Sequence, residues 1–383
     1  MLLLMCDVPG TSIIFEALWN IFRRRVKMKK LLAVLLILTM VFTFAACGSN
    51  DAGDEGAATD EVITIKLAGT VADTHPITQS EYKFAELLEQ YSGGTMKVEC
   101  YPNCQLGSNR ELYEQMQNGS IQMAEAGAVI LANFTDKFKF TSLPYLFNSP
   151  AAFQAFLYSE EGQQMVQDIE DECGFRILAC FENGMQAITN SKHEIATAAD
   201  MAGLKIRTQE NDILLQIYTQ MGCSPMPMAF TELFTGMQQG TVDGQVNPIL
   251  IAYTGNYDEV QDYCTDVNAV YDVASVSINS DFYNSLTDEQ RGWIDQAMMD
   301  AKNFNLQASV DAAQEAVDNL DVEFHWLTDE ERQTFADATS GVYDWFKANI
   351  NEPKLDTYLA AIEEINEMDK AGKLDPITGD IIG

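Results

Sequence analysis

An eleven-residue segment occurs twice in this chain, and the two copies are separated by the length of a small domain. Residues 111–121 read Glu-Leu-Tyr-Glu-Gln-Met-Gln-Asn-Gly-Ser-Ile, and residues 232–242 read Glu-Leu-Phe-Thr-Gly-Met-Gln-Gln-Gly-Thr-Val. Each copy predicts the last turns of a helix, a left-handed glycine after it, and then a strand. This spacing favours two similar α/β lobes with a cleft between them, where a small ligand would bind. The alternative is chance recurrence of a common helix–glycine–strand pattern.

The N-terminal 47 residues have the pattern of a targeting leader. Lysines at 27, 29 and 30 precede the apolar run 31–38, and small residues follow at 45–46. This is the order of a signal peptide, and the run is too short for a comfortable membrane span. The sequence Phe-Ala-Ala-Cys at 44–47 resembles a bacterial lipobox, so Cys47 is the expected lipidation site. Met28 is a natural start, and residues 1–27 are then an over-extended gene start; a genuine long leader is the other interpretation.

Residues 48–61 contain no large apolar side chain, and we expect a flexible tether there. With lipid on Cys47, this tether would hold the protein on the outer face of the cell membrane, in the periplasm or at the cell surface. Without residues 1–47 the chain has 17 Lys and Arg against 55 Asp and Glu, a net charge of −38. Such a surface repels nucleic acid and anionic headgroups, so the lipid would be the only membrane contact. An arginine inside this acidic protein should have a specific anion.

Strand and helix patterns alternate along the body of the chain, which favours an α/β fold with mixed or parallel sheets flanked by helices. A helical pattern opens at Thr287 and continues to about Leu320, roughly 50 Å at ~1.5 Å per residue. A helix of that length would cross both lobes. No clear strand pattern follows about Asn279, so we expect the last helices to brace the lobes. The other expected elements are strands at 63–68, 96–101, 175–181 and 204–207, a helix at 79–92, a capping box at 108–111, and helices that open at 328 and 353.

The sequence offers little that indicates catalysis. It has three histidines, and it contains no zinc-protease helix, nucleophile elbow, phosphate loop or dinucleotide-binding glycine pattern. The cysteine spacing fits no zinc motif, so no metal or cofactor is expected. Six cysteines outside the leader are expected to be buried free thiols, with disulfides at 100/104 or 173/180 as the alternative.

Several segments resemble the solute-binding proteins of tripartite ATP-independent periplasmic (TRAP) transporters, the DctP-type dicarboxylate-binding family. The resemblance runs from about residue 62 to the C-terminus and is strongest over 203–248. The segments are His75-Pro76, Tyr101-Pro102-Asn103, Gln105-Leu106-Gly107, 143–147 (Leu-Pro-Tyr-Leu-Phe), Glu182-Asn183-Gly184, 203–207 (Gly-Leu-Lys-Ile-Arg), 225–234 (Pro-Met-Pro-Met-Ala-Phe-Thr-Glu-Leu-Phe), 239–245 (Gln-Gly-Thr-Val-Asp-Gly-Gln) and Asn247-Pro248.

The resemblance implies a two-lobed, periplasmic-binding-protein-like fold, a helix that crosses both lobes, and no catalysis. Residues 62–184 with about 271–305 would form lobe I, and residues 185–270 with about 306–383 would form lobe II and the bracing helices. It also implies an organic acid as ligand, membrane permease subunits as partners, and a monomer. A sensor that reports to a membrane receptor is an alternative, and an extracytoplasmic lyase or hydrolase is a more distant one.

Arg207 is the leading candidate for binding the ligand. It ends the predicted strand 204–207, and α/β sheets bind ligands at the ends of their strands. A guanidinium group fits a carboxylate through two charge-assisted hydrogen bonds. An internal ion pair, for example with Glu210, is the alternative that the pattern alone favours. The resemblance reverses that preference, since the matching arginine holds the ligand carboxylate in the family.

The resemblance adds further candidates. Asn247 matches a ligand-contacting asparagine, although an asparagine before Pro248 is also typical of a turn. Phe230 is a candidate pocket wall or a core residue, and His75 is expected to shape the loop that opens the first helix. The remaining candidates are Thr70, Asn109, Gly127 and Tyr271.

Gln186 departs from the family pattern in a way that bears on the ligand. Relatives commonly carry an arginine there, so a second cationic ligand contact would be replaced by a neutral amide. A buried site with one positive charge fewer should bind a dianion less well. The sequence therefore predicts a monocarboxylate, or a ligand whose second group is polar but uncharged.

Overall fold

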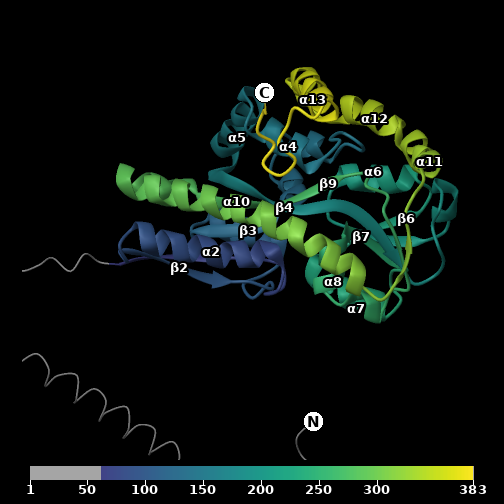
Figure 1. Cartoon of the computed structure of the whole chain (residues 1–383), viewed down its shortest axis with the longest axis horizontal. Coiled ribbons are helices and arrows are strands. Elements are labelled where there is room, and N and C mark those ends of the chain that lie inside the picture. The colour runs from purple at the N-terminus through teal and green to yellow at the C-terminus, as the bar shows by residue number, and fades with distance from the viewer. Residues whose placement is uncertain (1–61, 383) are drawn as a thin grey trace, which may run out of the picture. The chain divides into compact units, whose positions relative to one another are not determined.

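In the computed structural model, one continuous mixed sheet extends through both halves of the molecule, and its long strand β4 (Phe175–Asn190) takes part in both (Figure 1). The structure describes residues 62–382, within which the sheet has ten strands. The predicted leader, the predicted lipidation site Cys47 and the predicted tether at 48–61 lie outside the described residues. The mixed sheet with helices around it confirms the predicted fold class.

One half of the sheet contains the first strands of the chain. Its order is β2, β1, β3, β9 and β4, and the pairs β1–β2 and β1–β3 are parallel while β3–β9 and β9–β4 are antiparallel. The bounds are β1 Ile63–Ala68, β2 Met96–Tyr101, β3 Met123–Gly127, β4 Phe175–Asn190 and β9 Tyr271–Asn279.

The other half of the sheet continues from β4. There β4 pairs with β7 and β8 antiparallel, β7–β5 and β5–β6 are parallel, and β10 pairs with β8 at the edge. The bounds are β5 Lys205–Thr208, β6 Ser224–Pro227, β7 Gly244–Pro248, β8 Tyr263–Thr265 and β10 Glu323–His325. The expectation of no strand after Asn279 is wrong at β10, which has only three residues and forms through its pairing with β8.

Strand β4 is longer than the sequence indicates and connects the two halves. Its first part pairs with β9, and residues 186–190 pair with β7. The predicted strand ends at 181, and Asn183-Gly184, a pair typical of turns, follows closely. The structure instead has a register shift between Glu182 and Gly184, with Gly184 at φ +122°, so the strand continues past a bulge. The expected lobe boundaries beside this bulge, at 184/185 and 270/271, stay a prediction.

Helix α10 (Asp288–Asn319) confirms the prediction of a long helix that crosses both lobes. It packs against α2 at one end and α8 at the other, with β4 between them (Figure 1). The Oδ1 atom of Asn305 accepts a hydrogen bond from the backbone N–H of Glu182, and the Ser309 hydroxyl donates to the Glu182 carbonyl at 3.4 Å. The middle of α10 is therefore attached to β4 next to its bulge.

The other helices surround the sheet, and the C-terminal ones pack on helices of both halves. Helix α13 contacts α4 and α5, while α11 and α12 contact α6. His75 caps α2, because its Nδ1 atom accepts from the Ile77 N–H at 3.2 Å, which confirms its expected role. The bounds are α2 Pro76–Tyr91, α3 Asn109–Gln117, α4 Pro150–Leu157, α5 Glu160–Cys173, α6 Asp212–Gln220, α7 Phe230–Gln238, α8 Ile249–Thr254, α9 Ser280–Ser285, α11 Asp329–Thr339, α12 Gly341–Asn349 and α13 Leu355–Lys370.

The repeated segment forms the same local structure in both copies. Helix α3 leads through Gly119 into β3, and α7 leads through Gly240 into β7. Both glycines are left-handed, at φ +76° and +69°, and each donates to the carbonyl of the methionine three residues earlier, at 3.1 and 3.0 Å. The identical leucines and methionines are buried in the core. Identity in the two copies therefore follows from the same cap and the same packing.

We predict that Gly119→Ala and Gly240→Ala each lower the free energy of unfolding by roughly 1–2 kcal/mol, the cost of a left-handed alanine. A Cβ added at either glycine meets no atom within 4 Å, so backbone strain is the whole effect. The control is Gly292→Ala inside α10, where a Cβ also meets nothing and alanine should stabilise the protein by about 0.5–1 kcal/mol. Urea unfolding of the purified mature protein checks this, and neutral substitutions at 119 and 240 would contradict the shared cap.

Candidate ligand-binding site

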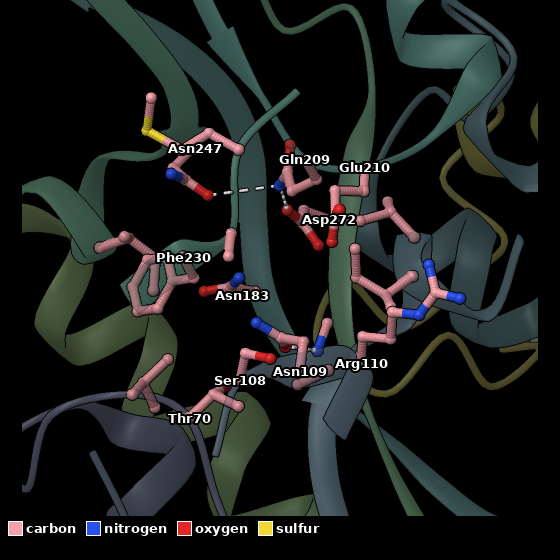
Figure 2. Close-up of a pocket in the computed structure, with 18 of the residues that line it drawn as sticks. Thr70, Ser108, Asn109, Arg110, Asn183, Gln209, Glu210, Phe230, Asn247 and Asp272 are labelled. Carbon is pink, nitrogen blue, oxygen red and sulfur yellow. Dashed lines mark hydrogen bonds between the residues drawn. The ribbon is translucent and has the colours of Figure 1, made fainter. Parts of the chain in front are cut away.

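A hollow lies between the two halves of the sheet, where strands from both halves end (Figure 2). The free space at its centre is about 40 Å³, so its walls lie close together. It is lined from one half by Thr70, Val71, Ser108, Asn109, Arg110, Glu125, Gly127, Val129 and Ile130, and from the other half and strands β4 and β9 by Asn183, Arg207, Gln209, Glu210, Met228, Ala229, Phe230, Asn247, Ile251, Asp272 and Ala274.

The topology explains why these residues meet. Thr70 follows β1 and Gly127 ends β3, while Arg207 lies near the end of β5 and Asn247 near the end of β7. The carboxyl ends of parallel strands meet at one edge of a sheet, which is where open α/β sheets bind ligands. Six of the eight predicted site residues line the hollow: Thr70, Asn109, Gly127, Arg207, Phe230 and Asn247.

Arg207 is buried, with 1% of its surface exposed, and it forms no ion pair with any carboxylate in residues 62–382. Its Nε and Nη2 atoms both donate to the Met228 carbonyl, at 3.0 and 2.8 Å. The Nη1 atom has no hydrogen-bond partner among the described residues. The expected alternative, an ion pair with Glu210, is therefore absent from the described structure. Burial lowers the pKa of Arg207 to about 10, so the group is still positively charged at neutral pH.

Asp272 is a buried carboxylate whose charge favours the charged form of Arg207, although the two form no ion pair. Its Oδ2 atom accepts hydrogen bonds from Gln209 at 3.1 Å and from Gln186 at 3.4 Å. Gln209 also donates to the Oδ1 atom of Asn247 at 3.3 Å (Figure 2). Burial raises the pKa of Asp272 to about 6, and the two glutamines and the charge of Arg207 oppose that rise.

The wall formed by the first half of the sheet is held by local hydrogen bonds. The Thr70 N–H donates to Oε2 of Glu125 at 2.7 Å, and its hydroxyl donates to the same oxygen at 3.1 Å. Asn109 accepts from the Gly127 N–H at 2.7 Å through Oδ1. Burial raises the pKa of Glu125 to about 7, and the bonds from Thr70 oppose that rise. This wall therefore combines an acid with amide and hydroxyl groups.

Two predicted site residues do not line the hollow. Gln186 lies behind Asp272, where it also accepts from the Tyr218 hydroxyl at 3.4 Å. The Tyr271 hydroxyl donates to Glu182, whose pKa is raised to about 8 by burial and by the nearby charge of Asp272. The bulge in β4 accounts for the position of Gln186, because one extra residue changes which side chains face the hollow. Tyr271 precedes Asp272 on β9, so alternation along the strand directs its side chain to the opposite face.

Phe230 and Asn247 both line the hollow, as their functional interpretations predict. Phe230 opens α7 and lines the hollow, and it also packs against the neighbouring core. Asn247 lies inside β7 rather than in a turn, and its side chain donates to Gln245 at 2.6 Å. Its orientation is thus fixed by the strand and by its amide neighbours.

Four buried polar residues of the hollow were not predicted as site residues: Glu125, Asn183, Gln209 and Asp272. The two acids had a detectable signal, since each interrupts a strand of apolar and small residues, 123–127 and 271–279. A carboxylate in a buried strand is rare unless it is paired or functional. Gln209 had no such signal, because its place in the site depends on a hydrogen bond to Asp272, which lies 63 positions away in the chain.

The described residues contain no group of three or more His, Cys, Asp or Glu that could hold a metal ion. The six described cysteines are free thiols, four of them buried and two half-buried, so the expected thiol state is confirmed. In residues 62–382, no helix has the length and apolar character needed to cross a membrane. What the hollow offers chemically is one unpaired guanidinium nitrogen surrounded by acids, amides and hydroxyls.

Comparison with known proteins places this architecture in a family. The family model of the bacterial extracellular solute-binding proteins, family 7 (DctP), matches residues 67–349. The C4-dicarboxylate-binding periplasmic protein DctP of Rhodobacter capsulatus is 31% identical over 312 residues, which cover 79% of this chain and 92% of that protein. The 2,3-diketo-L-gulonate-binding periplasmic protein YiaO of Escherichia coli is 27% identical over 285 residues, or 74% and 86% of the two chains.

Solved structures agree with the sequence comparisons. A sugar acid binding protein of Advenella mimigardefordensis in complex with galactonate superposes with a TM-score of 0.77 at 29% identity, covering 79% of this chain and 99% of that one. A TRAP periplasmic solute-binding protein of Shewanella oneidensis with bound succinate gives 0.75 at 25% identity, covering 80% and 99%. The chain therefore belongs to the bacterial extracellular solute-binding proteins, family 7, the DctP-type binding proteins of TRAP transporters.

Proposed function

We propose that this protein captures an organic acid in the hollow between its lobes, holds the carboxylate with Arg207, and delivers the acid to the membrane permease subunits of a TRAP transporter. The single observation that carries the proposal is the state of Arg207, a buried guanidinium without a carboxylate partner and with a free Nη1 atom. A buried charge is costly unless it is paired, and a ligand carboxylate would complete the pairing.

The geometry of Arg207 favours an anionic ligand over a structural role. Two of its donors are occupied by one backbone carbonyl, which fixes the plane of the guanidinium. The remaining donor belongs to a residue that lines the hollow. A carboxylate that accepts from Nη1 would form a charge-assisted hydrogen bond in a water-poor site, where such bonds are strongest.

The ligand we propose is a monocarboxylate, or an acid whose second group is polar but uncharged. The relatives named above were solved with galactonate and with succinate, so the family alone leaves both classes open. In this chain, Gln186 replaces a cationic family residue and lies behind Asp272, away from the hollow. The other lining arginine, Arg110, pairs with Glu114 at 3.1 Å on the surface of its own helix. A second ligand carboxylate would thus lack a dedicated cation.

The fold supports a receptor that closes on its ligand. Strand β4 and helix α10 connect the two halves, so a change of angle at the β4 bulge would open or close the hollow. Closure would present a new surface to the permease. The proposed receptor acts without catalysis and as a monomer.

The proposed location is the outer face of the cell membrane. Cys47, in its lipobox-like sequence, would carry the lipid anchor, and residues 48–61 would form the tether that keeps the receptor near the permease.

The first prediction concerns the ligand carboxylate. Arg207→Met keeps much of the apolar side chain but removes the charge. It should weaken binding of the tightest-binding organic acid by roughly 3 kcal/mol or more, because a buried charge pair is broken. For the unmodified protein, an acid at ~100 times its dissociation constant should add about 2.7 kcal/mol of stability. Thermal-shift screening of the mature protein against organic acids measures both effects.

The matched control for this experiment is Lys205→Met, two residues earlier on the same strand and exposed to solvent. It changes the net charge by the same amount and should leave the ligand-induced shift intact. If Arg207→Met kept the full ligand-induced thermal shift, or if Lys205→Met lost as much of it as Arg207→Met, then Arg207 would not be the residue that holds the acid.

The second prediction concerns the anchor. In the native host, Cys47→Ser should prevent acylation and move the protein from the membrane fraction to the soluble extracytoplasmic fraction. Residues 62–382 contain no helix that could replace the lipid as an anchor. Fractionation with immunoblotting and lipid labelling measures this redistribution. Unchanged membrane retention without a lipid would contradict the proposed anchor.

A further inference from the structure

Four buried polar atoms of residues that line the hollow have no hydrogen-bond partner among residues 62–382. One is a donor, Nη1 of Arg207, and three are acceptors, namely Oδ1 of Asp272, Oε1 of Gln209 and Oδ1 of Asn183. A carboxylate on the ligand satisfies the donor, but it contains no hydrogen for the acceptors. A ligand that carries hydrogen-bond donors as well as a carboxylate would satisfy all four atoms.

Asp272 is the most demanding of these acceptors, because it is a carboxylate with only 2% of its surface exposed. Its Oδ2 atom accepts from two amide groups, whereas Oδ1 has no partner. An acid with a purely structural role would be expected to have both oxygens hydrogen-bonded, because a buried charged acceptor left unpaired loses its hydration without compensation. Asp272 lines the hollow, and its Oδ1 atom keeps its hydrogen-bonding capacity free (Figure 2).

The charges around the hollow also favour a ligand with a single carboxylate. Its lining contains three acids, Glu125, Glu210 and Asp272, and no lysine. Of its two arginines, Arg110 is already paired with an acid of its own helix. Arg207 alone is left for the ligand, and it can serve one carboxylate. A second ligand carboxylate placed toward Asp272 would meet a like charge in a poorly solvated site, which is strongly unfavourable.

We propose that Asp272, held by Gln209 and Gln186, is the specificity-determining residue of this site: it accepts a hydrogen bond from a hydroxyl or ammonium group of the bound monocarboxylate and excludes a second carboxylate. The inference rests on the proposed function, since Arg207 must hold the first carboxylate. It also assigns a role to Gln186, which positions Asp272 from behind and does not touch the ligand itself.

Two matched series of acids test this inference. Butyrate derivatives with the same four-carbon chain differ only in the distal group: 4-hydroxybutyrate carries a hydroxyl, 4-aminobutyrate an ammonium, and succinate a second carboxylate. Galactonate and galactarate form a six-carbon pair, in which a terminal hydroxyl is replaced by a carboxylate. Dissociation constants for the mature protein would be measured by titration calorimetry.

For the unmodified protein, we expect the hydroxyl or ammonium member of at least one series to bind ten-fold or more tightly than its dicarboxylate partner. Whether the hydroxyl or the ammonium member binds more tightly identifies the donor. Asp272→Asn keeps the shape but removes the charge and supplies a donor, and it should reduce this preference at least ten-fold. Asp356→Asn, an exposed acid on α13, is the control that should leave the preference unchanged.

The outcomes separate this inference from the function on which it rests. Tighter binding of succinate or galactarate to the unmodified protein would overturn it, and this measurement does not depend on the folding of any variant. An unchanged preference in a folded Asp272→Asn variant would also overturn it, while weaker binding in Arg207→Met would leave the proposed function standing. If no organic acid bound in the thermal-shift screen, the proposed organic-acid site would fail, and the role of Asp272 with it.

Discussion

A buried positive charge without a fixed negative partner is the feature on which the rest of this structure depends. The guanidinium of Arg207 lies at a strand end, is held in plane by the Met228 carbonyl, and keeps one donor for the hollow. In a chain with a net charge of −34, a carboxylate to pair with it would be easy to find. The structure instead places Asp272 and Glu210 near enough to favour the charged form, but in no ion pair with it. The charge is thereby kept available for a ligand.

The scaffold around this charge is built to bring two walls together. Both copies of the repeat deliver a strand end to the hollow, β3 at Gly127 and β7 at Asn247. Strand β4 and α10 connect the copies, and α10 is bonded to β4 beside the bulge at Gly184. The ligand groups thus come from separate elements of both halves, while the connection between the halves is confined to a few backbone segments. Each wall can therefore stay rigid while the distance between the two walls changes.

Local signals in the sequence predicted local structure well. The strands at 63–68 and 96–101 and both glycine caps are where the patterns place them, because a strand pattern or a left-handed glycine depends on a few adjacent residues. The length of β4 was underestimated, and β10 was missed, since both depend on pairing with distant strands. Six of eight predicted site residues line the hollow, but Gln186 does not, because a bulge decides its side of the sheet. The proposed role of Asp272 could not be predicted, because it depends on contacts with Gln186 and Gln209, which are distant in the sequence.

The most direct test of the account is a crystal structure of the protein with its tightest-binding organic acid. The account predicts a ligand carboxylate oxygen at about 2.7–2.9 Å from Nη1 of Arg207, the ordinary length of a charge-assisted hydrogen bond. A complex in which the acid occupies the hollow while Nη1 of Arg207 makes no contact with its carboxylate would contradict the central claim.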